Sequence, residues 1–320
     1  MHARLYGASL ALLLMPAVGS AQSFPSKSIR VIVPYAPGGS TDVVLRTLAP
    51  RLTEEFGQSV VVDNRPGGGS TIGLDLAAKS PPDGHTWGIP NITFGANPSM
   101  IKQMPFDSEK DFVPVSQLSV VTMVLSVHPS VPARSVKDLI ALATSRPGDL
   151  NFGSAGNASA NHLATALFMQ RTGVNLVHVP YKGGGPAVIS LLGGETSILF
   201  ATIPSAIQHI QAGKLRGLAV TTLTPVAAAP ELPTLDASGV PGFDLSAWDG
   251  LWAPAGTPRP IVDKLNAALR VALNDPQTRE RMLVLGAETV PGTPEDLARL
   301  VATELPRWAN AVRQTGAKID

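Results

Sequence analysis

The chain of 320 residues contains no cysteine. This absence excludes disulfide bridges, thiolate metal sites, thiol nucleophiles and attachment of a lipid to an N-terminal cysteine. An excess of charge of one sign is also lacking, because 25 Lys and Arg residues balance 24 Asp and Glu residues. A chain of balanced charge without a run of Lys or Arg has no electrostatic footprint for nucleic acid or an anionic membrane surface. We therefore expect no nucleic-acid partner.

Long apolar runs are missing as well, except near the N-terminus. Residues 5–18 are almost wholly apolar, follow a weakly basic start with His2 and Arg4, and precede the small residues Gly19-Ser20-Ala21. This three-part layout is typical of a secretory signal peptide. A membrane anchor is the alternative, but the run is too short to span ~30 Å of hydrocarbon comfortably. We predict that residues 1–21 are a signal peptide cleaved near Ala21, and that the mature protein is exported and soluble.

Catalytic and metal-binding motifs are absent from the sequence. It contains no G-x-S-x-G, no H-E-x-x-H, and no pair of histidines at the i, i+4 spacing of a helical metal site. The glycine run after Arg65 and Pro66 looks like a phosphate-binding loop, but it has the spacing of neither a P-loop nor a dinucleotide fingerprint. We therefore interpret residues 65–69 as a structural turn, and we predict a non-catalytic protein with no metal and no cofactor.

The sequence does contain a repeated alternation of short β-branched runs and amphipathic segments. Ile29 to Val33, Val60 to Val62 and His85 to Ile89 have the composition of strands, and the first two lead through Gly-rich turns into helical spacing of apolar residues. Leu150 to Phe152 and Val177 to Val179 belong to a second series of the same kind. Strand–helix alternation specifies a parallel sheet with helices on its faces, so we predict an α/β fold.

Two apolar runs stand outside this alternation and divide the chain. Val120 to His128 and Gly250 to Pro258 share one form, an apolar run followed by a Pro-punctuated turn and a helix. We interpret them as two strands that connect two lobes. The prediction is a discontinuous first lobe of residues 22–122 and 243–320, a continuous second lobe of residues 123–242, and a ligand cleft between the lobes.

Two turns combine small and hydroxyl-bearing residues. Each follows a strand and opens a helix, which is where ligands bind in open α/β sheets. The N–H groups of a first helical turn have no helical partner and the helix dipole adds about half a positive charge, so a carboxylate can bind there without any Arg. The candidate ligand contacts in the first turn are Ala36, Pro37, Gly38, Gly39, Ser40 and Asp42. Those in the second turn are Ser154, Ala155, Gly156, Asn157 and Ser159.

Further candidates flank these turns. Asn91 and Thr93 end the third predicted strand and would supply polar groups to the cleft. Lys182 precedes three glycines, so it either reaches the cleft mouth or lies on the surface, and His162 either contacts the ligand or only packs or caps its helix. The alternative for both turns is a tight connection with capping Ser and Asp. The presence of two such turns in one exported, two-lobe chain favours a ligand site.

These segments resemble the Bug family, the TctC-like substrate-binding proteins of tripartite tricarboxylate transporters, over essentially the whole mature chain. The resemblance implies a periplasmic binding protein of type II topology whose lobes close like a Venus flytrap on a carboxylated ligand. It also implies that the two turns hold the ligand partly through backbone amides and water, and that the partners are membrane subunits of a secondary transporter. The matching segments are Phe24-Pro25-Ser26-Lys27 and residues 34–42, 61–67, 81–84, 153–157, 179–184 and 253–258.

The chain departs from the family pattern at three places. Ala201-Thr202 stands where Asp-Asn is common, which argues against pairing of a ligand ammonium group there and leaves Thr202 as the candidate contact. Ala158 stands where Gly is usual and Ala166 where Glu is usual, so the family's shape for the second turn does not carry over directly. We therefore expect a non-amino mono- or dicarboxylic acid as the ligand, aromatic acids included.

The resulting prediction is a monomer that captures a small organic carboxylate for a tripartite tricarboxylate-type transporter. A sensor that presents the same ligand to a signalling kinase has the same fold and site, so the sequence leaves this alternative open. A periplasmic enzyme is less favoured, because an acid–base pair of Asp42 and His162 would have no nucleophile beside it.

Overall fold

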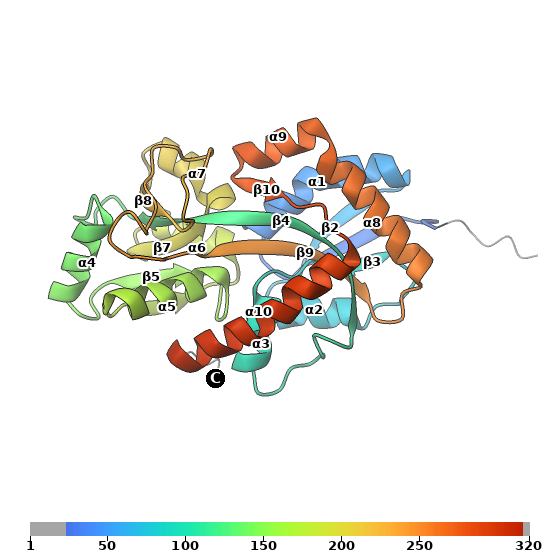
Figure 1. The fold of residues 1–320 in the computed structure, drawn as a ribbon, viewed down its shortest axis with the longest axis horizontal. Coiled ribbons are helices and arrows are strands. Elements are labelled where there is room, and N and C mark those ends of the chain that lie inside the picture. Colours follow the sequence, from blue (N-terminus) through green and yellow to red (C-terminus); the bar gives the residue numbers. More distant parts are fainter. Residues whose placement is uncertain (1–23, 316–320) are drawn as a thin grey trace, which may run out of the picture.

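The computed structural model describes residues 24–315, and the predicted signal peptide lies outside this range. Within it, no helix is long and apolar enough to cross a membrane. Figure 1 shows two halves, each with its own group of strands and helices, joined by long strands through the middle of the molecule.

The first half is built on three parallel strands. β1 (Ile29–Val33) lies between β2 (Val60–Asn64) and β3 (Thr86–Gly88). Helices α1 (Ser40–Phe56), α2 (Thr71–Ala78) and α3 (Thr93–Met100) follow β1, β2 and β3 in turn. Thr93 therefore begins a helix, whereas the sequence analysis placed it at the end of a strand.

Helix α1 illustrates why these segments adopt their structure. Its apolar residues Val44, Leu48 and Leu52 recur at helical spacing and are completely buried. The helix ends at Gly57, which has a left-handed φ of 62° that favours glycine. Packing of this apolar face on the sheet fixes the position of the first predicted turn, which immediately precedes α1.

The second half repeats the arrangement. β5 (Asn151–Ser154) lies parallel to both β6 (Val177–Pro180) and β7 (Ile198–Thr202). The second predicted turn again connects the central strand to the helix that follows it. The remaining elements of this half are α4 (Val136–Ser145), α5 (Ala160–Thr172), α6 (Gly184–Leu192), α7 (Ile203–Gln211) and β8 (Arg216–Val220).

Two long antiparallel strands connect the halves, as the two apolar runs predicted. β4 (Phe112–Val127) pairs with β9 (Ser246–Pro254) between Phe112 and Thr122, with β7 from Met123 onward and with β8 from Val124 onward. The sheet path is therefore continuous, in the order β2-β1-β3-β9-β4-β7-β5-β6. The direction of these two strands was not predicted: both run antiparallel to their neighbours, because a strand that leaves one half for the other runs against them.

The C-terminal elements return to the first half. α8 (Arg259–Asn274) packs on α1 and β4, and α9 (Pro276–Val284) packs on β10 (Ala287–Thr289), which pairs with β4. α10 (Pro294–Thr315) packs on α3 and β4 and also reaches α5 in the second half (Figure 1). The predicted residue boundaries of the two lobes stay a prediction.

Candidate ligand site

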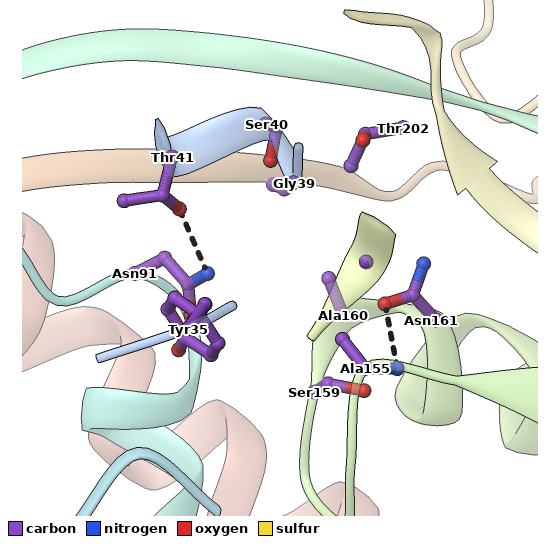
Figure 2. Close-up of a pocket in the computed structure, with 12 residues that line it drawn as sticks. Tyr35, Gly39, Ser40, Thr41, Asn91, Ala155, Ser159, Ala160, Asn161 and Thr202 are labelled. Carbon is purple, nitrogen blue, oxygen red and sulfur yellow. Dashed lines mark hydrogen bonds between the residues drawn. The ribbon is translucent and has the colours of Figure 1, made fainter. Parts of the chain in front are cut away.

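A narrow cavity lies between the two halves, beyond the carboxyl ends of β1, β5 and β7. Its volume is about 30 Å³, room for about two water molecules, so the halves are closed on each other. Figure 2 shows Ser40 and Thr41 of one half facing Ser159 and Ala160 of the other. The twelve lining residues are Tyr35, Gly39, Ser40, Thr41, Asn91, Ala155, Ser159, Ala160, Asn161, Gly184, Thr202 and Ala247.

Three helices begin at the cavity wall. The first residues of α1, α5 and α6 are Ser40, Ala160 and Gly184, and all three line the cavity. Within residues 24–315, the N–H groups of Ser40 and Thr41 have no hydrogen-bond partner, as is usual for a first helical turn. None of the twelve lining residues is charged. The cavity therefore offers N–H donors and the positive ends of helix dipoles, a combination that suits a small anion.

Asp42 lies behind the first turn and does not line this cavity. Its carboxylate accepts hydrogen bonds from the Gly38 N–H, Arg46 Nε and Asn64 Nδ2, each at 3.0 Å. Burial on its own would raise the pKa of Asp42, but the hydrogen bonds from Arg46, Gly38 and Asn64 outweigh burial and lower the pKa. The Asp42 carboxylate thus bonds within and behind its own turn and holds the turn in shape.

Replacing Asp42 with alanine should lower the free energy of unfolding by about 2–3 kcal/mol, because three donors lose a charged acceptor. Urea unfolding measures this loss. Asp263→Ala is the matched control, since it removes an exposed carboxylate whose one ion pair among residues 24–315 is with Arg259 on the same helix, and such pairs contribute less than ~0.5 kcal/mol. Equal losses in the two variants would show that Asp42 does not brace the turn.

Ser154 also bonds within its own half. It is completely buried, and its Oγ lies 2.6 Å from His178 Nε2 and 3.1 Å from the Gly156 backbone nitrogen. Ser159, by contrast, lines the cavity and caps α5 by accepting from the His162 N–H. The second turn thus divides its hydroxyls between internal bracing and the cavity wall.

Asn161 anchors the second turn from the first turn of α5. Its Oδ1 accepts from the Ala155 N–H at 3.3 Å, and its Nδ2 donates to the Phe200 carbonyl at 2.6 Å (the first contact is dashed in Figure 2). The side chain therefore links the turn after β5 to the neighbouring strand β7. This residue was missed by the sequence analysis, although it lies only two positions beyond the predicted turn.

His162 packs in an aromatic stack beneath the second turn. Its ring lies 4.2 Å from the ring of His178, which in turn lies 4.8 Å from the ring of Phe152. His162 Nδ1 accepts a hydrogen bond from the Ala158 N–H. Burial lowers the pKa of both histidines to about 4. Both rings are consequently neutral at pH 7, and His162 is not among the residues that line the cavity.

The stack should make the protein less stable as the pH falls from about 6.5 toward 4. In this window the unfolded chain binds protons on both histidines, while the folded rings, with a pKa of about 4, stay neutral. At pH 5 we expect a loss of about 1–2 kcal/mol relative to pH 7.5, after discounting the partly exposed His178 for solvent screening. The double variant His162→Gln/His178→Gln, compared by urea unfolding at both pH values, should lose less than the parent; an unchanged difference would refute the assignment.

Glycines make direct contact between the halves beside the cavity. The Ala36 N–H donates to the Lys182 carbonyl at 3.0 Å, across the boundary between the halves. A Cβ atom at Gly185 would lie only 2.4 Å from the Pro37 carbonyl oxygen, and one at Gly183 would lie 2.8 Å from the Ala36 nitrogen. The absence of side chains therefore permits this backbone approach, which we call the glycine contact of residues 36–39 and 183–185.

Lys182 lines a second cavity next to the first. This space has a volume of about 270 Å³ and shares Tyr35 and Ala155 with the narrow cavity. Gly156 and Asn157 of the second turn face this second space. Its walls are Pro34, Tyr35, Gly67, Gly68, Gly69, Ser70, Ala155, Gly156, Asn157, Pro180, Tyr181 and Lys182.

The other predicted residues divide between the wall and its support. Asn91 and Thr202 line the narrow cavity. Thr93 Oγ1 instead lies 2.6 Å from the Tyr35 hydroxyl, behind the wall. Burial raises the pKa of Tyr35, so this phenol stays protonated. Tyr35 was missed because an aromatic residue after a strand is more often part of the core.

Within residues 24–315, no group of three or more His, Asp or Glu side chains could hold a metal ion. Besides Asp42, a second carboxylate close to the cavity is buried, that of Asp249 on β9, which is 1% exposed. Asp249 was not predicted from the sequence.

A known protein family and several known proteins are similar to most of this chain. The family described as tripartite tricarboxylate transporter family receptor (TctC) matches residues 44–317. Protein BugT of Bordetella pertussis is 39% identical over 302 residues, which cover 94% of this chain and 93% of BugT.

Solved structures agree with this match. The periplasmic binding protein BugD has a TM-score of 0.89 and 35% identity, with 92% of this chain and 99% of BugD covered. Rpa4515 of R. palustris, solved with adipate, has a TM-score of 0.90 and 36% identity, with 92% of this chain and 100% of that chain covered. The likeness to BugD confirms the predicted two-lobe periplasmic-binding-protein fold.

Proposed function

Because the chain belongs to the tripartite tricarboxylate transporter receptor family, as its segments predicted, we propose that it captures a small carboxylic acid in the periplasm for membrane subunits of such a transporter. Members of this family are solute-binding proteins. The acid would bind in the narrow cavity between the halves and would be released there without chemical change.

The observation that carries the proposal is the convergence of three helix N-termini on a cavity lined by no charged side chain. An anion there meets unpaired N–H groups of α1 and the positive ends of helix dipoles. Each hydrogen bond from an N–H to a carboxylate contributes ~1.5–3 kcal/mol, so donors from both halves together would give micromolar or tighter affinity.

The direct contacts in this proposal come from the residues that line the wall. They include the predicted Gly39, Ser40, Asn91, Ala155, Ser159 and Thr202. Asp42, Thr93, Ser154 and His162 would support these residues from behind. Gly156, Asn157 and Lys182 would contact only a ligand long enough to extend into the adjoining cavity.

Opening and closing of the two halves would admit the ligand. The cavity of about 30 Å³ is much smaller than the ~300 Å³ at which pockets for drug-sized ligands begin, so the halves must separate to take up even a small acid. We propose that they move as the lobes 22–122 with 243–320 and 123–242, and that the ligand favours closure because it bonds to both.

The ligand would be a non-amino mono- or dicarboxylate. Within the narrow cavity no Asp or Glu faces the space, so a ligand ammonium would lack a charged partner there. The relative Rpa4515 was solved with adipate, a dicarboxylate without an amine, which is consistent with this class.

Titration calorimetry with a panel of mono- and dicarboxylic acids tests the proposal. We expect at least one acid to bind with micromolar or tighter affinity and to be recovered intact. The corresponding amides, which lack the negative charge, are matched controls and should not bind. Failure of every acid, or conversion of a bound acid to a product, would overturn the proposal.

A further inference from the structure

Asp249 is a buried carboxylate beside the cavity, and its partners are hydroxyl groups. Its Oδ1 accepts from Thr41 Oγ1 at 2.6 Å, and its Oδ2 accepts from Ser119 Oγ at 3.1 Å. No ion pair to Asp249 occurs within residues 24–315. Burial raises the pKa of Asp249 to about 6, so the group is ionised at pH 8 and can only accept hydrogen bonds.

This carboxylate fixes the direction in which Thr41 can bond. A threonine hydroxyl has one hydrogen, and the Thr41 hydrogen is committed to Asp249. Asn91 Nδ2 donates to the same oxygen at 3.4 Å, as the dashed line in Figure 2 shows. One lone pair of the Thr41 oxygen therefore remains for the ligand. Toward the cavity, the Thr41 side chain is an acceptor and not a donor.

Thr41 consequently presents two opposite groups from one residue. Its backbone N–H, unpaired within residues 24–315, is a donor for a ligand carboxylate. Its hydroxyl oxygen is an acceptor for a ligand donor close to that carboxylate. A 2-hydroxy acid carries this pair, an acceptor carboxylate and a donor hydroxyl on adjacent carbon atoms.

Resting on the proposed function, we infer that Asp249 orients the Thr41 hydroxyl and thereby makes the site select a 2-hydroxycarboxylate over its deoxy counterpart. An amine in the same position would also donate, but a buried ammonium needs several acceptors, and Asp249 bonds to Thr41 without lining the cavity itself. Asp249 is a positioning residue, since it does not line the cavity.

Calorimetry at pH 8 with two ligand pairs tests this inference: malate against succinate, and 2-hydroxyadipate against adipate. In the better-bound pair we expect the hydroxy acid to bind about 10-fold more tightly, which is the effect of one additional satisfied hydrogen bond. In Asp249→Ala the Thr41 hydrogen is free to donate to the carboxylate. The deoxy acid should then bind about 10-fold more tightly than it binds the parent, and the ratio should approach one.

Three further variants separate selection from mere support of the fold. Thr41→Val removes the acceptor and should also bring the ratio to one, so it tests the inference if Asp249→Ala does not fold. Thr41→Ser keeps the hydroxyl and should retain the ratio. Ser119→Ala removes the other partner of Asp249 without touching Thr41, and it should retain the ratio as well.

The outcomes distinguish the two proposals. If none of these acids or of the wider panel binds, the proposed function fails and the inference falls with it. If acids bind but the hydroxy and deoxy forms bind equally, only the inference is wrong. If both Asp249→Ala and Thr41→Val keep the parent's preference for the hydroxy acid over the deoxy acid, these two residues do not cause the preference. If aspartate binds more tightly than malate, the ligand group that Thr41 accepts from is an amine and not a hydroxyl, and the inference is wrong.

Discussion

Replacing Ser40 with aspartate should abolish the binding of carboxylic acids and leave the fold at least as stable. The new carboxylate would stand at the first residue of α1, on the cavity wall. Two like charges 4 Å apart repel by about 4 kcal/mol at an effective dielectric constant of 20, which corresponds to roughly a 1,000-fold loss of affinity. An acidic side chain in the first turn of a helix, however, gains ~0.3–1 kcal/mol from the helix dipole.

Calorimetry and urea unfolding together check this result. Ser40→Asn is the matched control, because asparagine has almost the same size as aspartate but no charge. This variant should retain most of the parent's affinity for carboxylic acids. A Ser40→Asp variant that still binds acids as tightly as Ser40→Asn would mean that the anion does not sit at the N-terminus of α1.

The second large effect is expected at the glycine contact of residues 36–39 and 183–185. Gly185→Val should weaken ligand binding by about 10- to 100-fold without unfolding either half. A Cβ atom at residue 185 would lie 2.4 Å from the Pro37 carbonyl oxygen, a backbone atom that cannot rotate away. Relief of an overlap of this kind costs ~1–3 kcal/mol, and separation of the halves would relieve it at the expense of the closed state.

Gly193→Ala provides the comparison, because it lies at the opposite end of the same helix α6, where a Cβ atom would meet no atom closer than 3.5 Å. We expect this variant to bind like the parent. Small-angle X-ray scattering should show Gly185→Val in a more extended form even with saturating ligand, and Gly193→Ala in the compact form. Normal affinity of Gly185→Val would show that the glycine contact is not required for closure.

Much of the fold followed from local patterns. The apolar spacing of α1, its end at Gly57 and the two apolar runs that became β4 and β9 were all visible in the sequence. The antiparallel direction of β4 and β9 was not, since apolar composition does not distinguish a strand's direction. Direction depends on which half the chain enters next, a property of the whole topology.

The two turns were located from the sequence, but the function of each residue in them was not. Asp42 and Ser154 have the polar groups expected of ligand contacts, yet both point into their own turns. A side chain in a tight turn can bond to its own backbone or to a ligand, and the composition is the same in both cases. Thr41 was overlooked for a related reason, because its importance depends on Asp249, 208 positions away in the chain.

Strand β4 belongs to the sheets of both halves, and this affects how cooperatively the protein unfolds. Its N-terminal part pairs with β9 and its C-terminal part with β7 and β8, so the backbone amides of a single strand are protected by both halves. Neither half can melt without exposing an edge of the other. The protein should therefore unfold in one cooperative transition. A ligand bound in the cavity would slow amide hydrogen exchange throughout β4, and not only in the turns that contact the ligand.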